Sequence, residues 1–100
     1  MNFLFEDPFT QWLQQEGKAV EIYQPGAFLG APPLGRTLLI GQSRFVYRID
    51  ESKPDTLIIV LLERTSERQG LRSPFFDFIK FINLIKKAKV GIQQIQGHVE

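Results

Sequence analysis

The residue types that catalyse reactions or hold metal ions are scarce in this chain. The sequence has no cysteine and a single histidine, His98, so it lacks the ligands from which zinc sites are built. Three glycines between residues 24 and 36 are too widely spaced, and too mixed with proline, to form a phosphate-binding loop. The adjacent carboxylates Asp50 and Glu51 fall in predicted turns, where they shape the turn. We therefore expect no catalytic, cofactor or metal site and no enzymatic activity.

Positive charge is concentrated in the second half of the chain. Residues 64–89 contain seven basic and two acidic side chains, although the whole chain has a net charge of +1. Lys80 and Lys87 fall on the polar stripe of a predicted helix, where they could meet an acidic partner or phosphate groups. The same helix lacks the Arg, Asn or Gln pattern that reads base edges, apart from Asn83. We therefore do not expect nucleic acid as a partner, and we expect this face of the helix to be solvated. A regulator that binds nucleic acid through this helix is kept as an alternative function.

Apolar residues in an irregular segment are the other indication of a binding surface. Residues 24–36 hold three prolines and three glycines, which excludes a regular element across them, yet they also carry Phe28, Leu29 and Leu34. Such a loop either packs on the core or binds a partner, and we expect it to pack on the core. Phe76 lies beside the polar stripe of the predicted helix. The candidate partner-binding residues are Phe28, Leu29, Leu34, Phe76, Lys80 and Lys87.

The elements that position these residues begin with a short helix over residues 8–16. Asp7 is suited to cap it, because a carboxylate accepts from the unpaired backbone N–H groups of the first turn. Pro8 presets the backbone at the first helical position, and Gly17 favours the left-handed conformation that ends a helix. Trp12 could anchor a partner, but we expect it to hold this helix against the domain.

Strands are predicted over residues 19–24, 37–40, 44–50 and 56–62. In the third of them, Phe45, Tyr47 and Ile49 share one face, which we expect to lie in the core. Val46 shares the other face with two arginines, so that face is expected to be wet or at an interface. Pro54 indicates a turn before the fourth strand, since proline is excluded from the interior of a paired strand. The continuous apolar run of the fourth strand predicts a central position, buried on both faces.

A longer helix is predicted from Pro74 to Ala88 or Lys89, after a charged loop over residues 63–72. Ser73 and Pro74 repeat the cap and proline that begin the first helix. The apolar arc of this helix covers well over half its circumference, more than contact with one sheet requires. We therefore expect it to touch the sheet and a second layer, formed by the first helix and the Pro/Gly loop or by a partner. A last strand is predicted over residues 91–97.

These elements make a single α+β domain over residues 1–100. The domain comprises a short N-terminal helix, an antiparallel sheet of about four strands, one long amphipathic helix packed on the sheet and a C-terminal strand. With 43% hydrophobic and 23% charged residues, the composition is that of a globular protein. No apolar run approaches the roughly 20 residues that span a bilayer, and the N-terminus lacks signal-peptide features, so we expect a cytoplasmic protein. Pairing of sheet edges makes a homodimer a further hypothesis.

The order of several short motifs resembles the LcrR family, small cytoplasmic regulators of the low-calcium response in bacterial type III secretion. The matching pieces are Glu6-Asp7-Pro8, Trp12 and Gly17 near the start, Pro33-Leu34-Gly35, Gly41 and Tyr47-Arg48-Ile49 in the middle, and Ser73-Pro74-Phe75-Phe76, Ile95 and Gly97-His98-Val99 at the end. The resemblance covers nearly the whole chain. Members of the family continue beyond a segment like the one that ends here, so this chain is expected to be short for the family.

The resemblance implies a regulatory or chaperone-like protein that binds a protein partner, such as a secreted translocator or needle-tip component. It carries over no catalytic residues, and the motif positions Trp12, Gly35 and Arg48 are expected to be structural. A small type III secretion chaperone is a rival from the same biology. Those chaperones are usually acidic dimers with more elements after the long helix, whereas this chain has a calculated pI near 8.1.

Overall fold

The fold comes from a computed structural model that describes residues 6–50, 52–64 and 74–97 of the 100-residue chain. The predicted cap Ser73, most of the charged loop, Glu51 and His98 lie outside these residues. The elements in chain order are α1 (Pro8–Gln15), β1 (Val20–Tyr23), the 3₁₀ turn η1 (Ala27–Leu29), β2 (Gly35–Ile40), β3 (Ser43–Asp50), β4 (Lys53–Arg64), α2 (Pro74–Ala88) and β5 (Gln94–Gly97). The α+β class is as predicted.

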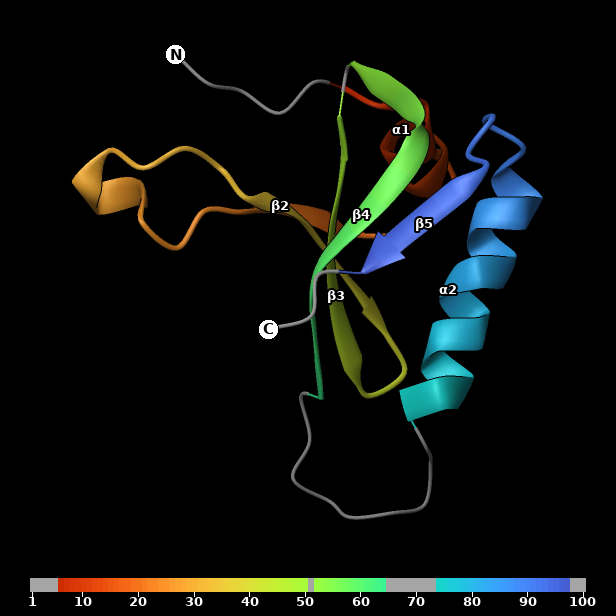
Figure 1. The fold of residues 1–100 in the computed structure, drawn as a ribbon. Coiled ribbons are helices and arrows are strands. Elements are labelled where there is room, and N and C mark those ends of the chain that lie inside the picture. Colours follow the sequence, from red (N-terminus) through yellow and green to blue (C-terminus); the bar gives the residue numbers. More distant parts are fainter. Residues whose placement is uncertain (1–5, 51, 65–73, 98–100) are drawn as a thin grey trace.

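The sheet has five strands in the order β1-β2-β3-β4-β5. The first four strands are antiparallel, as predicted, and form a meander, an order that the sequence left undetermined. Strand β5 instead pairs with β4 in parallel, from Thr56↔Gln94 to Ile59↔Gly97. Two parallel neighbours need a crossover between them, and α2 supplies it (Figure 1). The sheet is therefore mixed, because the long helix returns the chain to the same end of β4 from which that strand started.

Both helices pack on the sheet face that carries Phe45 and Tyr47, which are fully buried as predicted. Phe81 of α2 stacks on Phe45 with 4.6 Å between ring centroids. Phe9 of α1 meets the edges of Tyr47 and Phe81 at 5.5 and 6.0 Å. Aromatic contacts of this geometry add stabilisation beyond the area that they bury. The wide apolar arc of α2 thus touches the sheet and α1, as predicted, but the Pro/Gly loop that was expected in the same layer does not join it.

The opposite face of β3 differs from the prediction. Arg48 is exposed and Arg44 pairs with Glu63 of β4, but Val46 between them is fully buried. Val46 lies between Thr37 of β2 and a residue of β4 in the ladder, so its small side chain is enclosed by its cross-strand neighbours.

Strand β4 is internal to the sheet but longer and less buried than predicted. It begins at Lys53 and so includes Pro54, which was expected to stay in a turn. The register of β3 with β4 shifts between Ile49↔Leu57 and Asp50↔Lys53, so Pro54 has no partner in the ladder and its missing N–H removes no hydrogen bond. At the other end, Leu62 is 39% exposed, so the apolar run is not covered on both faces throughout.

Candidate protein-binding surfaces

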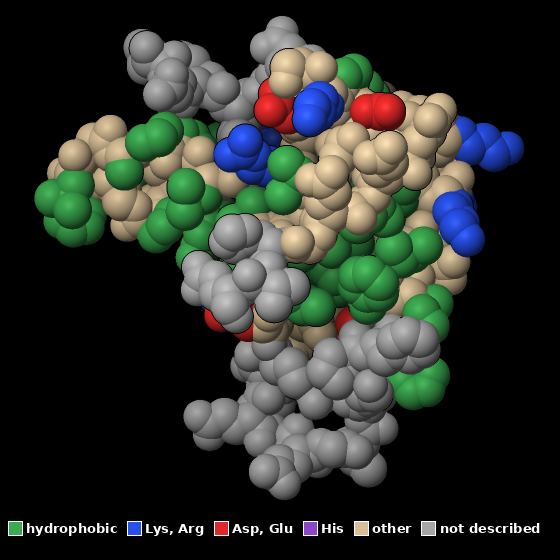
Figure 2. All heavy atoms as spheres, in the orientation of Figure 1, with side chains coloured by type: hydrophobic (Ala, Val, Ile, Leu, Met, Phe, Trp, Pro, Cys, Tyr) green, Lys and Arg blue, Asp and Glu red, His purple; other side chains and the backbone are tan. Residues whose placement is uncertain are grey.

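Residues 24–34, here called the arm, connect β1 to β2 and extend away from the body of the domain (Figure 1). Phe28 and Leu29 are 85% and 78% exposed, and Leu34 at the base of the arm is 42% exposed. The expectation that this segment packs on the core is therefore wrong. Figure 2 shows hydrophobic side chains on the surface of the arm. Exposed apolar side chains gathered in this way are typical of binding surfaces.

Hydrogen bonds inside the arm explain how it keeps a defined shape without the core. The Gln24 side-chain amide donates to the carbonyl oxygen of Ala31 at 2.8 Å, and Ala31 N–H donates to Gly26 O at 3.1 Å. At the base of the arm, Leu34 N–H donates to Tyr23 O of β1 at 2.9 Å. Gly30 ends η1 with φ of +80°, a left-handed conformation that glycine adopts without strain. These bonds satisfy backbone groups that would otherwise compete for sheet partners, and they leave the apolar side chains outside.

The six predicted partner-binding residues do not form one surface. Phe28, Leu29 and Leu34 lie on the arm, whereas Phe76, Lys80 and Lys87 lie on α2, on the opposite side of the sheet body (Figure 1). Phe76 is 57% exposed and both lysines are exposed, so every one of the six is accessible. The structure therefore separates an apolar surface on the arm from a basic one on α2.

The basic surface surrounds a cavity of about 390 Å³ between α2 and the end of β2, here called the lysine groove. Its lining residues are Lys18, Leu39, Ile40, Gly41, Lys80, Asn83, Leu84 and Lys87. Sequence reasoning found Lys80 and Lys87 but missed Lys18, which stands between α1 and β1. No spacing along the chain relates Lys18 to α2, so only the packing of the elements brings the three lysines together.

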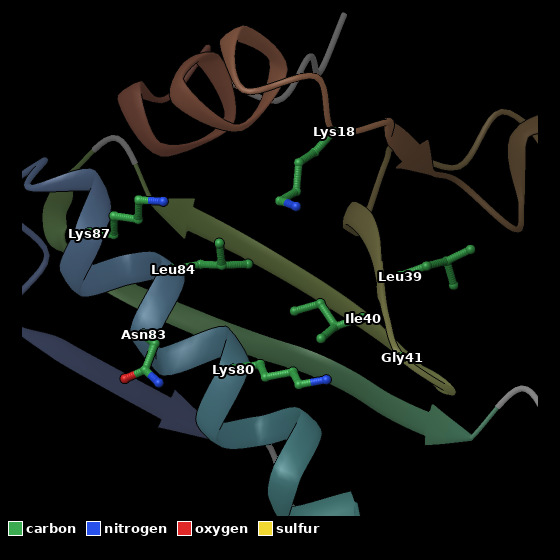
Figure 3. Close-up of a pocket in the computed structure, with 8 residues that line it drawn as sticks. All are labelled: Lys18, Leu39, Ile40, Gly41, Lys80, Asn83, Leu84 and Lys87. Atoms are coloured by element: carbon green, nitrogen blue, oxygen red, sulfur yellow. The ribbon is translucent and has the colours of Figure 1, made fainter.

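The geometry of the lysine groove follows from helix and strand periodicity. Lys80, Leu84 and Lys87 lie at i, i+4 and i+7 and so form one stripe of α2. Figure 3 shows Ile40 turned toward α2 and Leu39 turned to the other side of β2, as expected for consecutive strand residues. Ile40 and Leu84 form the apolar floor of the groove, and Figure 3 shows Lys18 and Lys87 on one side of this floor and Lys80 on the other.

A buried carboxylate fixes α2 against the β2–β3 turn beside this groove. Asp77, in the first turn of α2, accepts a 2.7 Å hydrogen bond from Ser43 Oγ, and both residues are buried. Gly41 in the turn has φ of +59°, and a Cβ there would lie 2.5 Å from Asp77 Oδ1. That oxygen has no hydrogen-bond partner among the described residues. Close approach of the glycine to the carboxylate therefore sets the distance between β2 and α2.

A second buried network holds α1. Asp7 caps the helix as predicted, accepting from Thr10 N–H at 2.6 Å and from the Thr10 hydroxyl at 2.8 Å. The same hydroxyl lies 2.6 Å from the Tyr47 hydroxyl, and Arg36 approaches Asp7 at 3.7 Å. Burial raises the pKa of the Tyr47 phenol above its ordinary value. The sequence predicts the cap alone, because the partners on β2 and β3 are distant in the chain.

Trp12, Gly35 and Arg48 are the three motif positions that were expected to be structural, and the structure supports this role for Trp12 and Gly35. Trp12 is half-buried, stacks near Phe9 of the same helix with 6.3 Å between ring centroids, and packs against the buried core, which holds α1 on the domain. Gly35 is buried, and a Cβ there would lie 2.6 Å from Tyr47 O, so only glycine fits. Arg48 is exposed.

Among the described residues no group of three or more His, Asp or Glu side chains is placed to hold a metal ion. Neither α1 nor α2 is long and apolar enough to cross a bilayer. The described part of the molecule is thus a small α+β domain that presents an apolar arm and a basic groove.

Residues 6–100 match the LcrR family, described as type III secretion system regulators, and the chain belongs to this family. It is similar to the low calcium response locus protein R of Yersinia enterocolitica, with 26% identity over 98 residues. The match covers 97% of this chain and 64% of that relative, so the chain spans somewhat less than two thirds of the relative's length. No solved structure matches.

Proposed function

We propose that this protein regulates type III secretion from the cytoplasm, without catalysis, by binding another protein of the secretion system through the arm. The supporting observation is the exposure of Phe28 and Leu29 at the end of an ordered projection. Burying one side chain of this size contributes about 1.5–3 kcal/mol, so two adjacent ones are sufficient to dominate a small interface.

The partner proposed is a secreted translocator or a needle-tip component, held in a chaperone-like manner. A projecting apolar arm is suited to covering an apolar segment of another chain. Family membership supports the setting in secretion, and the arm supports the mode of binding.

The test is a pull-down from a bacterium that secretes by a type III system, using tagged wild-type protein and a Phe28→Ser/Leu29→Ser variant. The wild type should retain a secretion component in near-stoichiometric amount, and the variant should lose at least about nine tenths of it. Leu62→Ser, which changes an exposed apolar residue away from the arm, is the matched control. Equal retention by the wild type and the arm variant would contradict the proposal. Light scattering of the purified protein would show whether the arm instead joins two copies of this chain.

A further inference from the structure

We propose that the lysine groove is a second binding site, which takes a short acidic segment of a partner protein. In this arrangement carboxylates of the segment meet Lys18, Lys80 and Lys87, and one aliphatic side chain rests on Ile40 and Leu84. The inference deepens the proposed protein-binding role and rests on it. It concerns a surface separate from the arm.

Charge is the first argument. Three ammonium groups from two separate parts of the chain border the groove, and none of its lining residues is acidic. The nearby Asp77, buried behind Gly41, is one carboxyl group against three lysines, so positive charge is in excess around the groove. Lysines that border a concave site create a positive potential there, which attracts an anionic partner.

The shape of the groove is the second argument. A volume of about 390 Å³ lies within the range of ligand sites, and an apolar floor between charged rims matches a segment that alternates acidic and aliphatic residues. Phosphate groups alone would leave the exposed part of Leu84 uncovered. The lining also contains neither arginine nor an aromatic side chain on which a base could stack, which disfavours nucleic acid.

The strand edge at the groove is the third argument. The β1–β2 ladder starts at Val20↔Leu38, so Leu39 and Ile40 have no partner from β1. The chain has turned away at that point, since Lys18 N–H donates to Leu13 O at 3.0 Å. An uncovered strand edge offers backbone N–H and C=O groups to an extended peptide. Backbone hydrogen bonds to this edge would therefore add to the ion pairs that the peptide makes with the lysines.

The experiment titrates the full chain against a fluorescent peptide in which glutamates flank two leucines, read by anisotropy at low and physiological salt. A Lys80→Gln/Lys87→Gln variant should bind about tenfold more weakly, as expected for the loss of two partly exposed charge pairs. Lys18→Gln, on a different element, should weaken binding about threefold. The matched control is Lys86→Gln/Lys89→Gln, which removes the same charge from the same end of the molecule but outside the groove, and should change affinity less than about twofold.

Three results would overturn the inference. Equal weakening by the groove and control variants would show general electrostatic attraction. If a peptide with glutamine in place of glutamate bound with the same affinity, the lysines would have no role in binding. Tighter binding of a single-stranded oligonucleotide than of the peptide would assign the groove to nucleic acid. Because the arm is tested by pull-down and the groove by peptide titration, a negative result for one surface does not affect the interpretation of the other. Circular dichroism of each variant confirms that it is folded.

Discussion

The arm and the lysine groove are both exposed, yet they are built in opposite ways. The arm holds its shape by hydrogen bonds within residues 24–34 and contributes no residue to the buried core. The groove instead exists only because α2 is anchored on the sheet by Phe81 and by the Asp77–Ser43 bond. One surface is local and carries apolar contacts, whereas the other depends on tertiary packing and carries charge. Changes to the core should therefore destroy the groove before they affect the arm.

The largest difference is expected between two phenylalanines. Phe81→Ala should lower the free energy of unfolding by about 3–5 kcal/mol, because it leaves a cavity where Phe9, Phe45 and Tyr47 meet. Phe28→Ala on the arm should change it by less than about 0.5 kcal/mol, since that side chain is exposed. Urea unfolding monitored by circular dichroism measures both. Comparable losses would mean that the arm packs on the domain after all.

Two glycines with positive φ, Gly41 beside the groove and Gly30 on the arm, provide a second comparison of the two surfaces. Gly41→Ala should cost about 2–3 kcal/mol, because the new Cβ would meet Asp77 Oδ1 as well as requiring a left-handed backbone. Gly30→Ala on the arm requires the same backbone but meets no atom within 4 Å, so it should cost about 1 kcal/mol. Thermal unfolding of the two variants is a direct comparison. A larger loss at Gly30 would contradict the tight contact between the turn and α2.

Salt should separate the two binding modes. Raising the ionic strength from about 50 to about 500 mM should weaken peptide binding at the groove by roughly tenfold, since exposed charge pairs are screened. Retention of the partner by the arm should hold or increase, because apolar contacts are not screened. Titration and pull-down at the two salt concentrations give the answer. A fall in both would indicate that one charged surface accounts for all binding.

The smallest effect concerns the network under α1. Tyr47→Phe removes the hydroxyl that meets Thr10 and should cost about 1 kcal/mol. The folded-state pKa of Tyr47 lies above its unfolded value near 10, so the neutral phenol stabilises the fold below pH 10 and that contribution is lost as pH rises further. The variant should therefore lack part of the alkaline loss of stability that is expected for the wild type, which urea unfolding at several pH values measures. An identical alkaline profile for the two proteins would show that Tyr47 does not contribute to it.

Local signals predicted the elements well, and tertiary relations were predicted poorly. The Asp7 cap, the start of α2 at Pro74 and the core face of β3 each depend on a few adjacent residues, and the structure contains all three. The exposure of Phe28 and the burial of Val46 depend on which other segments cover them, so the local sequence pattern gave the wrong answer for both. Lys18 joins Lys80 and Lys87 only through packing. The family could be inferred because it is carried by the order of short motifs along the chain.

The parallel pairing of β5 with β4 determines the order in which parts of the chain can fold during synthesis. The ladders that join β1, β2, β3 and β4 pair strands without an intervening α-helix, whereas the β4–β5 ladder joins Thr56 to Gln94 across α2 and must wait for that helix. During synthesis the meander, with its arm, emerges first, and its aromatic face lacks the cover of Phe81 until the helix follows. The nascent protein thus displays its apolar arm before its charged groove exists, and truncation after β4 should yield an aggregation-prone species that has the first surface without the second.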